Sequence, residues 1–130
     1  MKQQTLKLTL KKKWFDEILS GVKTKEYREI KKYWLWRLFW NNEKTKFTDE
    51  IIKYMKDPYE KFSDVEELLY FYGLEKKEFD YIQFFNGGHF SDKLPNFKIE
   101  LKDISIGIDT KDKYYFILKL GEILEKNNIL

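Results

Sequence analysis

The hydrophobic pattern at the start of the chain switches from a period of two to a helical period. Leucines alternate with polar residues over Thr5–Leu10, which predicts a strand with one buried face. Over Lys11–Ser20 the large apolar residues follow one stripe of an amphipathic helix. Gly21 is expected to cap that helix, and Val22–Glu29 alternates again. The pattern therefore predicts a strand, a helix and a second strand.

The middle of the chain carries three further helical patterns. Ile30–Trp40 is apolar nearly all round, so we expect a helix that is either deeply buried or contacts a partner through a spare face. Thr48 is expected to cap a second helix, ahead of two acidic residues in its first turn. Ser63 and Glu66 have the spacing of a capping box before a third helix, which Gly73 ends.

The last part of the chain returns to strand patterns. Three strands are predicted, at Phe79–Phe85, Phe97–Ile108 and Tyr114–Leu120. The alternation of Phe97–Ile108 changes phase near Lys102-Asp103, which indicates a bulge or tight turn that redirects the strand. Five strands with the helices early predict the α+β class, and we expect a small curled sheet or a partly open barrel.

Composition narrows the chemistry that the chain can perform. The 130 residues contain no cysteine, which excludes a disulfide framework, a thiolate nucleophile and a Cys-ligated metal. The single histidine, His89, excludes any site that needs two imidazoles. No apolar run approaches the roughly 20 residues of a membrane span. We therefore expect one soluble, cytoplasmic domain over residues 1–130, with no cofactor and no metal.

Positive charge and tryptophan are concentrated at the start of the chain. Residues 1–40 hold 11 basic and 4 acidic residues, whereas residues 41–130 hold 14 basic and 18 acidic residues. All four tryptophans lie within the first forty residues. Cations displace counterions from phosphates and flat rings stack on unpaired bases, so this combination is typical of a nucleic-acid surface. The alternative is a charged outer face over a Trp-rich core.

The most informative segment runs from Gly21 to Arg28. On a strand, Glu26 and Arg28 share one face about 6.5–7 Å apart. An Arg offers a planar fork for a phosphate or a base edge, a Glu accepts from an exocyclic amine, and Lys23 adds an ammonium beside a glycine turn. We expect these three charged side chains to face a ligand and not to pair with one another. The alternative is a solvated charged strand.

These residues carry a resemblance to a known family. Gly21, Lys23, Glu26 and Arg28 match the G-x-K-x-x-E-x-R signature of the ASCH domain (activating signal cointegrator homology), of the PUA-like superfamily. The string from residue 8 to residue 34 resembles a small bacterial and phage subgroup of these domains. The resemblance covers about residues 5–40 and 79–124, and residues 45–77 look like a helical insertion.

The resemblance implies a fold and a function. Such domains have a PUA-like β-barrel with a cleft beside the first helix, and the family is proposed to bind RNA. The resemblance assigns the ligand as RNA or a modified nucleotide, with Lys23, Glu26 and Arg28 contacting it. The segment with Phe85, Asn86 and Gly87 resembles the family's second cleft-lining segment, and Phe85 or the nearby Phe90 is expected to stack on a base.

Two other classes of function stay open. Some similar domains hydrolyse the acyl amide of modified cytidines through a Thr three residues after the Lys, and others are assigned ribonuclease activity. Here that position is Glu26, so hydrolysis would depend on Lys23 and Glu26 as an acid–base pair, with His89 as a further candidate. The third class is a protein-interaction module that uses Ile30–Trp40 and the inserted helices. Its tryptophans, Trp34, Trp36 and Trp40, are expected to form core or interface.

Overall fold

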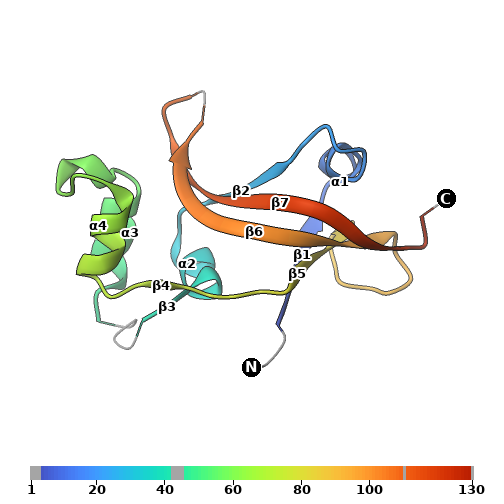
Figure 1. Cartoon of the computed structure of the whole chain (residues 1–130), viewed down its shortest axis with the longest axis horizontal. Coiled ribbons are helices and arrows are strands. Elements are labelled where there is room, and N and C mark those ends of the chain that lie inside the picture. Colours follow the sequence, from blue (N-terminus) through green and yellow to red (C-terminus); the bar gives the residue numbers. More distant parts are fainter. Residues whose placement is uncertain (1–3, 42–45, 110, 130) are drawn as a thin grey trace. The chain divides into compact units, whose positions relative to one another are not determined.

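The computed structural model describes residues 4–41, 46–109 and 111–129. Within these ranges the chain has a mixed α+β fold with four α-helices and a five-stranded sheet, which confirms the predicted class (Figure 1). The strand order of this sheet is β1-β5-β6-β7-β2, and β3 and β4 form a separate two-stranded sheet.

The chain divides into two compact units. Unit 1 contains the described residues of Met1–Glu26, Glu78–Asp103 and Leu118–Leu130. Unit 2 contains Tyr27–Lys77 and the described residues of Ile104–Ile117. Both units are discontinuous in sequence, because the long strands near the C-terminus run through each of them. A single domain over residues 1–130 therefore stays a prediction.

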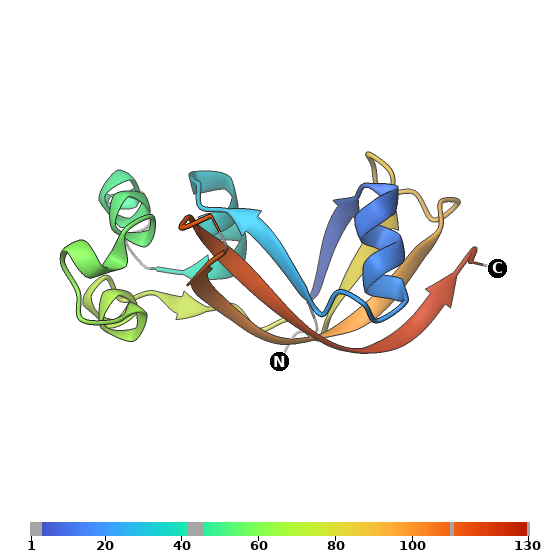
Figure 2. The ribbon, with the colours of Figure 1, turned by 90° about the horizontal axis from the view of Figure 1, so that it is seen from above.

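Unit 1 is organised around a parallel pair of strands that are far apart in sequence. β1 (Thr5–Leu10) pairs in parallel with β5 (Tyr81–Asn86), and β5 pairs in antiparallel fashion with the start of β6 (Asn96–Ile108). Helix α1 (Lys12–Leu19) packs against this sheet, as Figure 2 shows. A run of aromatic contacts forms the core beneath the helix.

The ring of Phe97 is central to that core. Its centroid lies 4.9 Å from the ring of Phe15 on α1 and 5.6 Å from the ring of Phe84 on β5. All three side chains are buried, together with the leucines of β1. Burying three phenylalanines beneath one short helix supplies much of the hydrophobic stabilisation of unit 1.

Three strands run from one unit into the other: β2 (Lys25–Glu29), β6 and β7 (Tyr114–Asn127). The predicted phase change in β6 is confirmed. Phe97 and Ile99 are buried before it, and Ile104 and Ile106 are buried after it. The change falls at Asp103, where β6 leaves unit 1. The strand thus exchanges its buried face at the boundary between the units.

Unit 2 holds the remaining helices and the small sheet. Its elements are α2 (Lys32–Leu38), β3 (Phe39–Trp40), α3 (Thr48–Met55), the 3-10 helix η1 (Pro58–Glu60), α4 (Val65–Phe71) and β4 (Glu75–Lys76). The predicted helix over Ile30–Trp40 is shorter than expected, because Phe39 pairs with Lys76 and Trp40 with Glu75. Of the predicted insertion, residue 45 lies outside the described residues, and the rest is mainly helical.

Two of the predicted helix caps are wrong in detail. Thr48 is the first residue of α3, and the capping position is occupied by Phe47, which makes no side-chain cap hydrogen bond. In α4 the cap is Asp64, whose carboxylate accepts the backbone N–H of Glu67 at 2.8 Å. Ser63 and Glu66 have the same spacing as Asp64 and Glu67, and both Ser and Asp are good capping residues, so the backbone conformation decides which residue caps.

Candidate nucleic-acid interface

Helix α1 places a tryptophan at the edge of its buried stripe. The helix starts at Lys12 after an extended Lys11, with no side-chain cap bond and no acidic residue in the first turn. Phe15 and Ile18 are buried in the core. Trp14 precedes Phe15 on the helix, so it lies at the edge of the buried face and is 39% exposed. The start of α1 therefore presents lysines and part of an indole ring to solvent.

The turn after α1 brings a further lysine back to this indole. Gly21 adopts φ +85°, a left-handed conformation that glycine takes at little cost, and the backbone N–H of Lys23 donates to the carbonyl of Glu17 at 3.0 Å. The Nζ of Lys23 consequently lies 4.5 Å from the centroid of the Trp14 ring. The Nζ of Lys13 lies 4.7 Å from the same ring. Two ammonium groups therefore flank one partly exposed indole.

Lys23 and Glu26 come together as an ion pair. The Nζ of Lys23 donates to Oε1 of Glu26 at 2.8 Å, and the two side chains are only 18% and 7% exposed. The expectation that the three charged residues do not pair with one another is therefore wrong for these two. A short loop after Gly21 lets them meet three residues apart, and the pairing offsets the cost of burying Glu26. In this geometry Glu26 orients Lys23 toward the indole.

The glycine turn after β5 lies beside the start of α1. Leu10 pairs with Asn86 across the parallel strands, and the backbone N–H of Gly87 donates to the carbonyl of Leu10 at 3.1 Å. Gly87 has φ +130°, and a Cβ there would come 3.4 Å from Leu94. Asn86 and Gly87 were predicted to lie near the first helix. The parallel pairing of β1 with β5 brings them there.

The two predicted stacking residues differ in exposure and lie away from α1. Phe85 is 1% exposed, whereas Phe90 is 53% exposed, and their rings are 5.5 Å apart. Because side chains alternate along a strand, Phe85 projects from the face of β5 opposite to that of Phe84, which faces α1 through Phe97. Of the two rings, Phe90 is the one that presents surface.

Arg28 belongs to unit 2, where it contacts a tryptophan. Its guanidinium lies 5.0 Å from the ring of Trp34, and the guanidinium of Arg37 lies 5.2 Å from that same ring. Arg37 also donates to the hydroxyl of Tyr33 at 3.1 Å. Both arginines of the chain are thus engaged with one aromatic group of unit 2. A ligand contact by Arg28 stays a prediction.

The remaining tryptophans, in α2 and β3, are not fully buried. Trp36 is half-buried and Trp40 is 51% exposed, whereas Leu35 and Leu38 of the same helical segment are buried. Lys77 connects the two tryptophans, because its Nζ lies 4.6 Å from the Trp40 ring and donates to the carbonyl of Trp36 at 2.6 Å. These tryptophans are therefore partly exposed, whereas the leucines and Phe39 belong to the core of unit 2.

A polar cluster on unit 1 was not anticipated from the sequence. Gln83, Asn96 and Asn127 come from three different strands and are linked by hydrogen bonds. Each falls in or beside an apolar strand pattern, but the pairing that joins them is long-range, so no local signal could have found it. His89, the other candidate for acid–base chemistry, is exposed in the turn after β5.

Comparisons with known proteins give no relative. No protein-family model matches the chain, and the searches of curated proteins and of solved structures found no match. None of the helices in the described ranges is long and apolar enough to cross a membrane.

Proposed function

We propose that the protein binds RNA or a modified nucleotide through the surface at the start of α1. The observation that carries this proposal is the pair of ammonium groups, from Lys13 and Lys23, that flank the partly exposed ring of Trp14. Unpaired bases stack on exposed aromatic rings, and cations beside such a ring contact the connecting phosphates. Here the ring that would stack on a base and the ammonium groups that would contact phosphate lie within 4.7 Å of one another, measured from the ring centroid to each Nζ.

The position of the lysines within α1 supports an anionic ligand. Lysines in the first turn of a helix oppose the positive end of its dipole, and this turn contains no acidic residue. Lys12 is partly compensated by Asp16, whose carboxylate lies 2.6 Å from its Nζ. Lys11 and Lys13 remain exposed around uncapped backbone N–H groups. A phosphate at this end would satisfy both the amides and the lysines.

The resemblance to ASCH domains is consistent with this proposal. Such domains place their ligand beside the first helix, and the signature residues Lys23 and Glu26 lie there as a pair. The PUA-like barrel and the family membership are part of the proposal. In it, Lys23 contacts phosphate and Glu26 holds Lys23 in place.

Binding of single-stranded RNA, followed by fluorescence anisotropy at several salt concentrations, tests the proposal. Trp14→Ala is expected to weaken binding about tenfold, because a base loses its stacking partner. Lys13→Ala is expected to reduce the slope of log affinity against log salt by about 0.7, the loss of one phosphate contact. Lys119→Ala, an exposed lysine on β7, is the control. Unchanged affinity and slope in both test variants would overturn the proposal.

A second candidate function is hydrolysis by the Lys23–Glu26 pair. The observation in its favour is the short, largely shielded contact of 2.8 Å, since a lysine and a carboxylate in such a contact can exchange a proton with a bound substrate. Glu26→Gln keeps a hydrogen-bond acceptor for Lys23 and removes the base. Turnover of an acylated cytidine or of RNA that falls about a hundredfold in Glu26→Gln, with binding retained, would identify an enzyme. No turnover by the natural sequence excludes it.

A further inference from the structure

Unit 1 has a hollow of about 550 Å³ on the face of its sheet opposite to α1. Gln83 pairs with Lys98 across β5 and β6, and Phe85 pairs with Asn96, so these side chains share one face. Phe84 and Phe97 occupy the other face, beneath α1. The hollow is therefore distinct from the surface around Trp14. Its volume is in the range of small-molecule sites.

The floor of the hollow is a fixed network of side-chain amides. The Nε2 of Gln83 donates to Oδ1 of Asn96 at 2.9 Å, and the Nδ2 of Asn127 donates to the same oxygen at 3.0 Å. Asn96 in turn donates from Nδ2 to the carbonyl of Leu94 at 2.9 Å. Asn96 is 1% exposed and Gln83 is 8% exposed. These buried amides hold one another in place, so the polar floor is already organised before anything binds.

Charged groups of both signs stand at the rim. The Nζ of Lys98 lies 3.5 Å from Oε2 of Glu125, and the same carboxylate oxygen accepts from Nδ2 of Asn127 at 2.8 Å. The hydrogen bond from Asn127, followed by the charge of Lys98, lowers the pKa of Glu125. The hydroxyl of Tyr81 raises the pKa of Lys98. Near neutral pH the rim therefore offers both a carboxylate acceptor and an ammonium donor.

The chemistry of the wall is balanced and entirely polar. Asp92, Lys126 and Asn128 complete the lining, so the two acidic and the two basic side chains cancel in charge. None of the described lining residues is apolar or aromatic, which makes the hollow unsuited to a stacked base. Without excess positive charge it is equally unsuited to a bare phosphate. A neutral ligand whose groups both donate and accept hydrogen bonds fits these walls.

We propose that the hollow binds the hydroxyl groups of a sugar. Each hydroxyl donates one hydrogen bond and accepts two, which matches a wall of amides, carboxylates and ammonium groups. The sugar has two sources with this same chemistry: a free saccharide, or the ribose of RNA, of which the second rests on the proposed function. In the ribose case, the hollow would distinguish RNA from DNA through the 2′-hydroxyl.

Side-chain amide NMR signals provide a direct test. In ¹⁵N-labelled protein the NH₂ signals of Gln83, Asn96 and Asn127 report on the hollow. Ribose, glucose, galactose and trehalose are titrated at millimolar concentration, and an RNA oligonucleotide is compared with DNA of the same sequence. Shifts with a saccharide identify a free sugar, and shifts with RNA but not DNA identify a ribose. Unshifted amides in every titration, or equal shifts with RNA and DNA and none with saccharides, would overturn the proposal.

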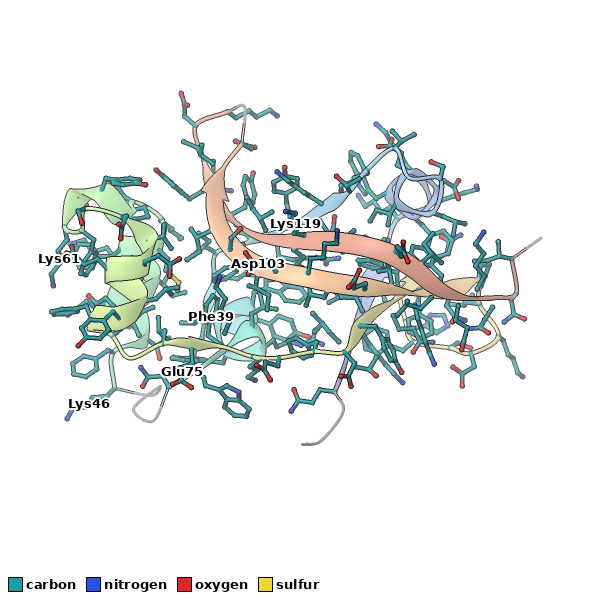
Figure 3. The ribbon with its side chains drawn as sticks, viewed as in Figure 1. Phe39, Lys46, Lys61, Glu75, Asp103 and Lys119 are labelled. Atoms are coloured by element: carbon teal, nitrogen blue, oxygen red, sulfur yellow. The ribbon has the colours of Figure 1, made fainter. Side chains whose placement is uncertain are left out.

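Variants separate this site from the one at α1. Asn127→Ala, at the half-buried edge of the network, is expected to weaken sugar binding about tenfold through lost hydrogen bonds. Lys119→Ala lies on the same strand outside the hollow and serves as the control (Figure 3). If sugar binding persists while Trp14→Ala and Lys13→Ala both leave RNA affinity and its salt slope unchanged, only the proposed function fails. If RNA binds at Trp14 while the amides never shift, only the hollow proposal fails.

Discussion

Each unit places a lysine beside aromatic rings, but the neighbours of the two lysines differ. In unit 1, Lys23 contacts the ring of Trp14 and donates a hydrogen bond to Glu26. In unit 2, Lys61 lies over four rings at 4.6–5.9 Å; they belong to Tyr54, Phe62, Phe71 and Tyr72. Figure 3 labels Lys61 beside the ribbon of α4. The rings around Lys61 belong to the packed side chains of unit 2, whereas the proposed function uses the ring of Trp14, which is 39% exposed, as the surface for a ligand.

A basic and aromatic composition does not by itself indicate nucleic-acid binding. Both units contain such residues, but the four rings around Lys61 also contact one another, with Phe62 5.5 Å from Phe71 and 5.9 Å from Tyr72. Rings that are packed together cannot separate to accept a base without losing those contacts. The proposed nucleic-acid binding therefore depends on the local arrangement at Trp14 and not on the aromatic content of the whole chain.

The largest expected effect is that of Phe97→Ala in the core of unit 1. Removing a ring that contacts both Phe15 and Phe84 is expected to lower the free energy of unfolding by about 3–5 kcal/mol. Trp14 is the one tryptophan of unit 1, so single-tryptophan variants report on each unit during urea unfolding. Because β6 and β7 run through both units, we expect the transitions at Trp14 and Trp36 to coincide. A later transition in unit 2 would contradict this expectation.

A smaller loss of stability is expected for Lys61→Met in unit 2. The variant keeps an apolar chain of similar length but removes the charge of this exposed lysine, so about 1 kcal/mol of cation–aromatic attraction is lost. Lys61→Arg should restore most of it. RNA affinity should stay unchanged, whereas Lys13→Met in unit 1 should lower the affinity and leave stability within about 0.5 kcal/mol. Reduced RNA affinity in Lys61→Met would remove the distinction between the two lysines.

The next smaller effect concerns the alkaline limit of unit 2. Burial, together with the hydrogen bond that its hydroxyl donates to Glu50 at 2.7 Å, raises the pKa of Tyr72 well above its usual range. Its contribution to stability is present below the ordinary tyrosine pKa and is lost as pH rises beyond that value. Tyr72→Phe should cost about 1 kcal/mol at neutral pH and remove part of the loss at high pH. Parallel urea-unfolding curves from pH 7 to high pH check this, and an unchanged alkaline slope would contradict it.

The sequence predicted the local structure better than the sites. The strand over Thr5–Leu10, the glycines that follow α1 and α4 (Gly21 and Gly73), and the phase change before Ile104 depend on neighbouring residues, and all are found in the structure. The capping residue of α4 was wrong by one position, because two consecutive residues offer the same chemistry.

The sites depend on contacts that the local sequence does not encode. The parallel pairing of β1 with β5 decides that Gly87 lies beside Leu10, and these residues are far apart in the chain. The amide network of Gln83 and Asn96 likewise requires the register between β5 and β6. The close pairing of Lys23 with Glu26 depends on the course of the turn after Gly21, which spacing along an ideal strand did not describe.

The smallest expected effect is the acid dependence of unit 1, which is the counterpart of the alkaline dependence of unit 2. The hydrogen bond from Asn127 and the charge of Lys98 hold the pKa of Glu125 below its usual range. Its contribution to stability is therefore present above the ordinary glutamate pKa and is lost as pH falls through the lower value in the folded protein.

Glu125→Gln should match the natural sequence in strong acid and be slightly less stable near neutral pH. Asn127→Ala should remove more of this acid dependence than Lys98→Met, because the hydrogen bond lowers the pKa most. Equal curves for all four proteins between pH 2 and pH 7 would show that the rim of the hollow carries no coupled charge.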